Sequence, residues 1–187
     1  MNKLLFMLAL LWVFQSQAIA DVRAEKDIDV KVQIEGEDVF VDVNFTVPAP
    51  ARLVWEVLTD FDHMSTFIGN LQSSKVIDRT ENIFRVAQKG IAKYGPVSFP
   101  FESIREIHLF SFNKIQTHMV SGNIHKLEGV TQLITEGDLT RVIYHADTIP
   151  GVWIPPGVGK LFIEHETREQ FQESRDEVMR RKRAANP

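Results

Sequence analysis

Apolar and polar residues alternate with a period of two from residue 28 to residue 47, as expected for strands that bury one face. The sequence Gly-Glu-Asp at 36–38 interrupts this alternation and is a hairpin-turn signal. Pro48 and Pro50 end it, because proline has no backbone N–H to donate to a neighbouring strand. The pattern predicts a two-stranded hairpin followed by a change of structure.

A helical period begins directly after the prolines. Five apolar residues fall on one face and predict an amphipathic helix of about three turns; they are Leu53, Val54, Val57, Leu58 and Phe61. A second short helical piece is predicted over 64–68, and Gly69-Asn70 ends it.

Asp60, Asp62 and His63 lie at the break between these two helices. Their side chains are of types that can ligate a metal. Residues of these types at a helix break also serve as caps, which satisfy free backbone amides. We favour the structural role and expect no metal site here.

The stretch 71–148 is interpreted as strands joined by tight turns, with one apolar face clearest at Val142, Tyr144 and Ala146. The predicted strands are 72–80, 83–92, 97–108, 110–120, 124–136 and 140–148, and they are separated by tight-turn signals. Long strands that follow one another through short turns favour an antiparallel meander.

The last predicted element is a helix over roughly 158–183, after a loop rich in proline and glycine. One face of this helix carries a stripe in which two of the five side chains are hydroxylic: Ile163, Thr167, Phe171, Ser174 and Val178. Such a stripe suits a helix that faces a partly polar cavity, and a plain groove over a sheet would also accommodate it.

The first twenty residues have the pattern of an export signal. Lys3 is their only charge, residues 4–14 are uninterrupted apolar, and Ala18-Ile19-Ala20 is a small-residue cleavage signal. Eleven apolar residues are too few to span a bilayer, which needs roughly 20. We expect cleavage after Ala20 and an exported, periplasmic protein of residues 21–187 that forms a single domain; an uncleaved anchor is the alternative.

Composition excludes several classes of function. The chain has no cysteine, so it has neither disulfides nor thiolate chemistry. It carries 21 basic against 25 acidic residues, a balance that argues against nucleic-acid binding. No nucleophile motif of the Gly-x-Ser-x-Gly type is present. We expect no cofactor and no metal, and nothing in the sequence specifies an oligomeric state.

Three stretches of the chain carry a resemblance to a known superfamily: "VPAPARLVWEVLTDFDHMSTF", "VSGNIHKLEGVTQLI" and "GDLTRVIYHAD". Together with the order of predicted elements, they resemble the helix-grip fold of the SRPBCC/START-like superfamily, including polyketide cyclase/dehydrase and coenzyme Q-binding START-type proteins. The resemblance implies an α+β fold. A curved antiparallel sheet of about seven strands would wrap around the long C-terminal helix, with two short helices after the first strand.

The resemblance also implies a cavity between sheet and helix that binds a hydrophobic small molecule such as a lipid, isoprenoid quinone or polyketide-like compound. Trp153 and Ile154 would form the pocket mouth, with possible transient membrane contact, or would pack their loop onto the sheet. Thr131 departs from the tryptophan of many relatives and makes one patch of the wall smaller and more polar. The ligand-binding residues expected on this basis are Phe99, Phe101, Thr131, Leu133, Val142, Tyr144, Ile163, Thr167 and Phe171.

Acid–base chemistry in such a cavity would need a titratable side chain beside the substrate. Tyr144 and His118 are the candidates, although a tyrosine on the apolar side of a strand also serves as a packed residue with one hydrogen bond. Arg85 and Arg105 lie within strands and could bind a ligand carboxylate or phosphate, or could point into solvent.

Three functions therefore remain open. A non-enzymatic carrier or binding protein for an apolar molecule is favoured, because no catalytic motif is present. A cyclase, aromatase or dehydrase acting in the same cavity is the alternative. An adaptor that binds another protein through its outer surface is the third.

Overall fold

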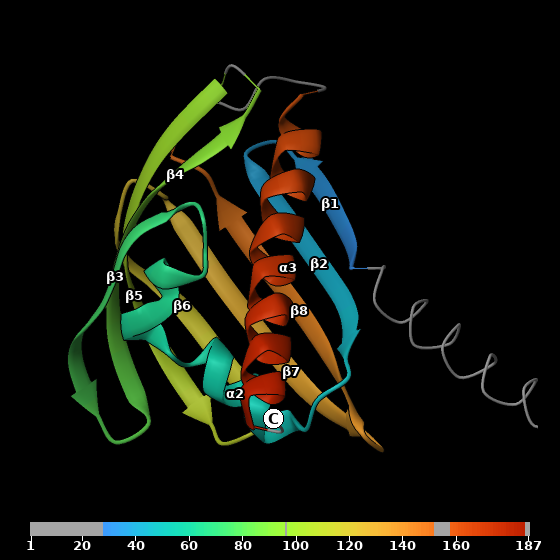
Figure 1. Ribbon diagram of the computed structural model, residues 1–187. Helices are drawn as coiled ribbons and strands as arrows, with labels where there is room; N and C mark the ends of the chain where they lie inside the picture. The colour runs from blue at the N-terminus through green and yellow to red at the C-terminus, as the bar shows by residue number, and fades with distance from the viewer. Residues whose placement is uncertain (1–27, 96, 152–157, 186–187) are drawn as a thin grey trace, which may run out of the picture.

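Eight antiparallel strands form one curved sheet in the computed structural model, which describes residues 28–95, 97–151 and 158–185 (Figure 1). The strand order is β1-β2-β8-β7-β6-β5-β4-β3, so only the pairing of β2 with β8 joins strands that are not consecutive. The strands, labelled as in Figure 1, are β1 (Asp29–Glu35), β2 (Asp38–Val47), β3 (Leu71–Thr80), β4 (Ile83–Tyr94), β5 (Val97–Phe110), β6 (Lys114–Gly122), β7 (Lys126–Glu136) and β8 (Leu139–Ile149).

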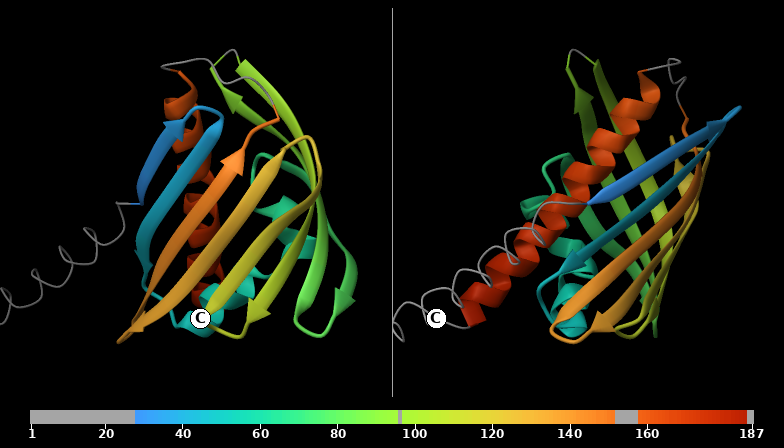
Figure 2. Two further views of the ribbon diagram at one scale, coloured as in Figure 1. Left: turned by 180° about the vertical axis from the view of Figure 1, so that it is seen from behind. Right: turned by 90° about the vertical axis from the view of Figure 1, so that its right-hand side faces the viewer.

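The described residues also form two short helices and one long helix. The α-helix α2 (Ala51–Leu58) and the 3₁₀ helix η1 (Phe61–Thr66) connect β2 to β3, and α3 (Gly159–Ala185) follows β8. Figure 2 shows α3 crossing the open, concave side of the sheet, with α2 near its C-terminal end. No helix in the described ranges is long and apolar enough to cross a membrane.

The first hairpin supplies much of the core. Its turn has Gly36 at φ +65°, a conformation that glycine adopts without strain. The period-two pattern is confirmed, since the side chains on one face of β2 are all buried: Val39, Val41, Val43, Phe45 and Val47. This face packs under α3, where the rings of Phe45 and Phe171 lie 5.5 Å apart.

The α+β helix-grip architecture expected from the sequence is confirmed, with two differences of detail. The sheet has eight strands where about seven were expected, because β1 and β2 both pair as full strands. For the same reason the two short helices follow the second strand and not the first.

The acidic break between α2 and η1 is structural, but its side chains do not cap a helix. Asp60, at the position preceding η1, makes no capping hydrogen bond; its carboxylate contacts His63 at 2.6 Å and Arg181 of α3 at 2.7 Å. Asp62 accepts a hydrogen bond of 3.0 Å from the backbone N–H of Val76 in β3. The predicted capping role is therefore wrong, and the two carboxylates hold this connection to α3 and to the sheet edge.

Candidate ligand cavity

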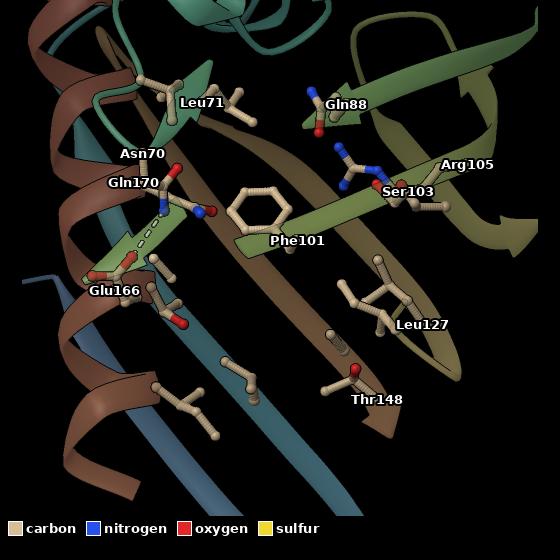
Figure 3. Close-up of a pocket in the computed structure, with 18 of the residues that line it drawn as sticks. Asn70, Leu71, Gln88, Phe101, Ser103, Arg105, Leu127, Thr148, Glu166 and Gln170 are labelled. Carbon is tan, nitrogen blue, oxygen red and sulfur yellow. Dashed lines mark hydrogen bonds between the residues drawn. The ribbon is translucent and has the colours of Figure 1, made fainter. Parts of the chain in front are cut away.

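A cavity of about 450 Å³ lies between the concave face of the sheet and α3 (Figure 3). Most of the side chains expected to bind a ligand line its wall: Phe99, Phe101, Thr131, Tyr144, Ile163, Thr167 and Phe171. Of the stripe on α3, Ser174 also lines the wall, whereas Val178 is buried in the core. A volume of this size and a mostly apolar lining are typical of sites for small organic molecules.

Leu133 and Val142 are not on the cavity wall. They face each other across β7 and β8, are 3% and 0% exposed, and belong to the continuous core. The helix α2 packs against both of these strands. The apolar pattern of the strands indicated which face these residues take, but not that they join one core cluster with Val54 and Val57 of α2.

Aromatic contacts join α3 to the sheet on both sides of the cavity. Phe99 of β5 and Phe162 of α3 meet edge to face with their ring centroids 5.2 Å apart. On the other side Tyr144 of β8 and Phe171 of α3 also lie 5.2 Å apart. Such pairs stabilise beyond their buried area and fix the spacing between helix and sheet.

Arg105 is the one arginine among the residues that line the cavity. It follows Phe101 and Ser103 at every second position of β5, and Figure 3 shows its guanidinium beside Ser103 and Gln88. Its Nε is buried without a hydrogen-bond partner, and no described residue forms an ion pair with it. Burial lowers the pKa of Arg105, but arginine keeps its charge in proteins. The cavity therefore contains a cation that the described protein leaves uncompensated.

Arg85 takes the opposite orientation. It lies one strand away on β4, is exposed, and pairs with Glu106 at 3.5 Å. The sequence did not decide which way the two arginines point. Arg105 faces the cavity, and Arg85 points outward. The period-two signal that could have separated them is the run Phe101, Ser103, Arg105, Ile107, in which the apolar ends mark the inward face.

Tyr144 and His118 also differ in position: Tyr144 lines the cavity and His118 does not. The ring of Tyr144 lines the cavity, and burial raises the pKa of its hydroxyl while the nearby charge of Arg105 lowers it. His118 is exposed and pairs with Glu128, its cross-strand neighbour on β7. A role for His118 inside the cavity is incompatible with this position.

A second group of polar side chains comes from the helix side. Glu166 of α3 accepts a hydrogen bond of 2.9 Å from the side-chain amide of Asn70 and one of 3.2 Å from the backbone N–H of Lys93. One turn further along α3, Gln170 also lines the wall. The sequence did not single out these residues, because Asn70 looked like a helix terminator and Glu166 like an ordinary helix carboxylate.

The proposed pocket mouth, Trp153 and Ile154, lies outside the described residues. On their C-terminal side Val158 and Leu161 are 49% and 53% exposed, and Val158 contributes to the cavity wall. Within the described ranges no three histidine, aspartate or glutamate side chains gather where they could hold a metal ion.

A family model described as "Polyketide cyclase / dehydrase and lipid transport" matches residues 47–174. A search of curated proteins finds no significant match.

Several solved structures are similar in fold to this chain. An aromatase/cyclase from a Streptomyces species superposes with a TM-score of 0.67 at 17% identity, covering 80% of this chain and 98% of that one. A STAR-related lipid transfer protein from Xanthomonas axonopodis gives 0.66 at 16%, covering 82% and 96%. A START superfamily protein from Mycobacterium smegmatis gives 0.65 at 14%, covering 75% and 97%.

Proposed function

Because the chain belongs to the polyketide cyclase / dehydrase and lipid transport family, we propose that it is an exported binding or carrier protein for a small apolar molecule held in the cavity. The ligand presents a hydrogen-bond acceptor, either a carboxylate or another oxygen-rich group, to Arg105. Its apolar body lies against the aromatic and aliphatic wall between β5 and α3.

The position of Arg105 is the observation that carries this proposal: it lines the cavity, has no ion-pair partner among the described residues, and buries its Nε without a hydrogen bond. Isolating a charge from water costs free energy unless a partner of opposite charge or a strong acceptor is present. A ligand acceptor supplies that partner, and a guanidinium offers five N–H donors in a fixed plane that fits a carboxylate. A purely hydrocarbon ligand would leave the charge without a partner.

Dodecanoate is a suitable probe, because it combines an apolar chain with one carboxylate. We expect Arg105→Met to weaken dodecanoate binding roughly tenfold or more, since a charge-assisted hydrogen bond contributes about 1.5–3 kcal/mol. Isothermal titration calorimetry measures the effect. Arg85→Met is the matched control, because it removes the same side chain from the outer face of the adjacent strand; its dissociation constant should stay within about twofold of the wild-type value. Equal affinities for the two variants would contradict the proposal.

A second candidate function is an enzyme of cyclase or dehydrase type, and the pairing of Tyr144 with Arg105 in one cavity favours it. A tyrosine whose pKa is raised stays protonated, so it can donate to an oxygen that gains charge during an enolisation, next to the cation. Tyr144→Phe separates the two functions. A carrier keeps dodecanoate binding within a few-fold, whereas an enzyme loses turnover of a polyketide-like substrate without losing its fold.

A further inference from the structure

We propose that Asn70 and Glu166 form a second polar subsite in the cavity, which accepts a hydrogen bond from a hydroxyl or amine group of the ligand. The inference rests on the proposed function and narrows its ligand class. The ligand would be an apolar molecule with an acceptor group at Arg105 and a donor group at a separate point. Hydroxylated fatty acids and hydroxylated aromatic acids have this chemistry.

The orientation of the Asn70 amide is the first argument. Its nitrogen donates to Glu166 Oε2 at 2.9 Å, and a carboxylate can only accept, so the nitrogen and oxygen of the amide are assigned by the contact. The amide oxygen therefore points away from Glu166. It is buried and has no hydrogen-bond partner among the described residues. Buried acceptors without a partner are rare and costly, so a donor inserted beside this oxygen would be favourable.

The main chain at Asn70 is held in place from two sides. Its carbonyl oxygen accepts a hydrogen bond of 2.9 Å from Ile91, and the preceding Gly69 donates to Glu173 of α3 at 2.9 Å. A side chain at Gly90 would place its Cβ only 2.2 Å from the carbonyl oxygen of Asn70, which shows how closely β4 approaches. These contacts fix where the Asn70 side chain starts, and its amide is held there by the hydrogen bond to Glu166.

Glu166 has acceptor capacity left at the same place. A carboxylate offers about four lone-pair positions. Two are used, by the amide of Asn70 and the backbone N–H of Lys93. Figure 3 shows the two side chains together at the α3 side of the cavity, with the ring of Phe101 between them and Arg105. The cavity thus has a donor wall on β5 and an acceptor wall at α3, separated by apolar surface.

Three acids that differ only at the far end of the chain test this arrangement: dodecanoate, ω-hydroxydodecanoate and ω-methoxydodecanoate. We expect the hydroxy acid to bind the wild-type protein about tenfold more tightly than the methoxy acid, because only the hydroxyl donates. In Asn70→Leu this ratio should fall to about one.

Comparing ligands within each variant makes the test independent of stability, since a loosened cavity weakens all three acids alike. Asn44→Leu is the control, because it makes the same change at an exposed position of β2 that does not line the cavity; its ratio should stay near the wild-type value. Arg105→Met should weaken the three acids equally. A wild-type ratio of one, or a ratio that Asn70→Leu leaves unchanged, overturns the subsite while the proposed function stands. If none of the acids binds, the proposed function fails and the subsite with it.

Discussion

A few residues whose side chains face the cavity distinguish this chain from a plain helix-on-sheet core. Most of the wall is apolar and would hold many molecules of the right size. On the proposed function, Arg105 on one side and the Asn70–Glu166 pair on the other would restrict that choice through hydrogen bonds. Apolar contacts would then supply affinity, and three polar side chains would supply orientation.

Two glycines of the sheet allow a matched test of packing. In Gly90→Ala the new Cβ would lie 2.2 Å from the Asn70 carbonyl oxygen and 2.5 Å from Phe101 Cζ, so the β3–β4 pairing must shift. We expect a loss of unfolding free energy of about 1–3 kcal/mol, as for other overpacked sites. Urea unfolding followed by circular dichroism measures it.

Gly129→Ala is the control for that change. Its Cβ would meet Tyr144 and Thr117 at 3.5–3.7 Å, which is ordinary van der Waals contact. Alanine also loses less backbone freedom on folding than glycine, so stability should be unchanged or slightly raised. Equal destabilisation by the two substitutions would show that the close approach at Gly90 has no energetic weight.

Much of the secondary structure follows from the sequence, because strands and helices impose different periods on buried positions. The stripe on α3 left a cavity and a plain groove open; Ile163, Thr167, Phe171 and Ser174 line a cavity, and Val178 is buried in the core. The position of β6 was less predictable. It begins at Lys114 and not at 110, because Phe112 occupies the left-handed region at φ +62° in the preceding turn. The turn contains no glycine that would mark it in the sequence. The inward face of β6 could therefore not be assigned, and the orientation of His118 stayed open.

The C-terminal part of α3 is fixed to the rest of the fold by charge as well as by packing. Glu177 accepts hydrogen bonds from Arg180 at 2.7 Å and from Arg181 at 2.6 Å, and Arg181 also reaches Asp60. Four basic residues follow one another near the end of this helix, at 180–183, and two of them pair here. Lys182 also contacts the carbonyl oxygen of Pro48.

Because of this network, the unfolding free energy should depend on pH in the acidic range. Hydrogen bonds from Arg180, joined by those from Arg181, lower the pKa of Glu177 from 4.5 to about 2. A lowered folded-state pKa contributes stability that is complete above pH 4.5 and is lost as the pH falls toward 2. The thermal midpoint of the wild type should therefore fall more steeply than that of Glu177→Gln between pH 5 and pH 3.

The thermal midpoints of the two proteins at pH 7 are the control. Glu177→Gln should unfold at a lower temperature than the wild type there, and the difference should shrink as acid is added. Glu56→Gln breaks an exposed pair with Arg52 on α2 and should change stability by less than about 0.5 kcal/mol at any pH. Parallel curves for wild type and Glu177→Gln would contradict the assignment.

At the scale of the whole molecule, the sequence predicts the fold in more detail than it predicts the function. The order of elements and the stretches around Trp55 and Gly129 pointed to the helix-grip fold, because these residues serve the framework shared by the superfamily. The cavity chemistry could not be read in the same way. Arg105, Asn70 and Glu166 come from β5, from the residue before β3 and from α3, and only folding brings them to one space.

Export is the prediction that belongs to this scale. The apolar run at 4–14 and the Ala-Ile-Ala sequence predict removal of residues 1–20. N-terminal sequencing of protein recovered from the periplasmic fraction should begin at Asp21. A mature chain that keeps Met1, or protein found only in the cytoplasm, would contradict it. Deletion of 4–14 should abolish export.

If Arg105 needs a ligand as its partner, ligand binding also affects how long a folded molecule survives. A ligand that binds only the folded form raises the unfolding free energy with its concentration, by about 2.7 kcal/mol at a hundredfold excess over its dissociation constant. The chain has no cysteine, so no covalent cross-link protects the empty form. Loaded molecules should therefore outlast empty ones in the presence of proteases, and the amount of protein that survives would follow the supply of its ligand.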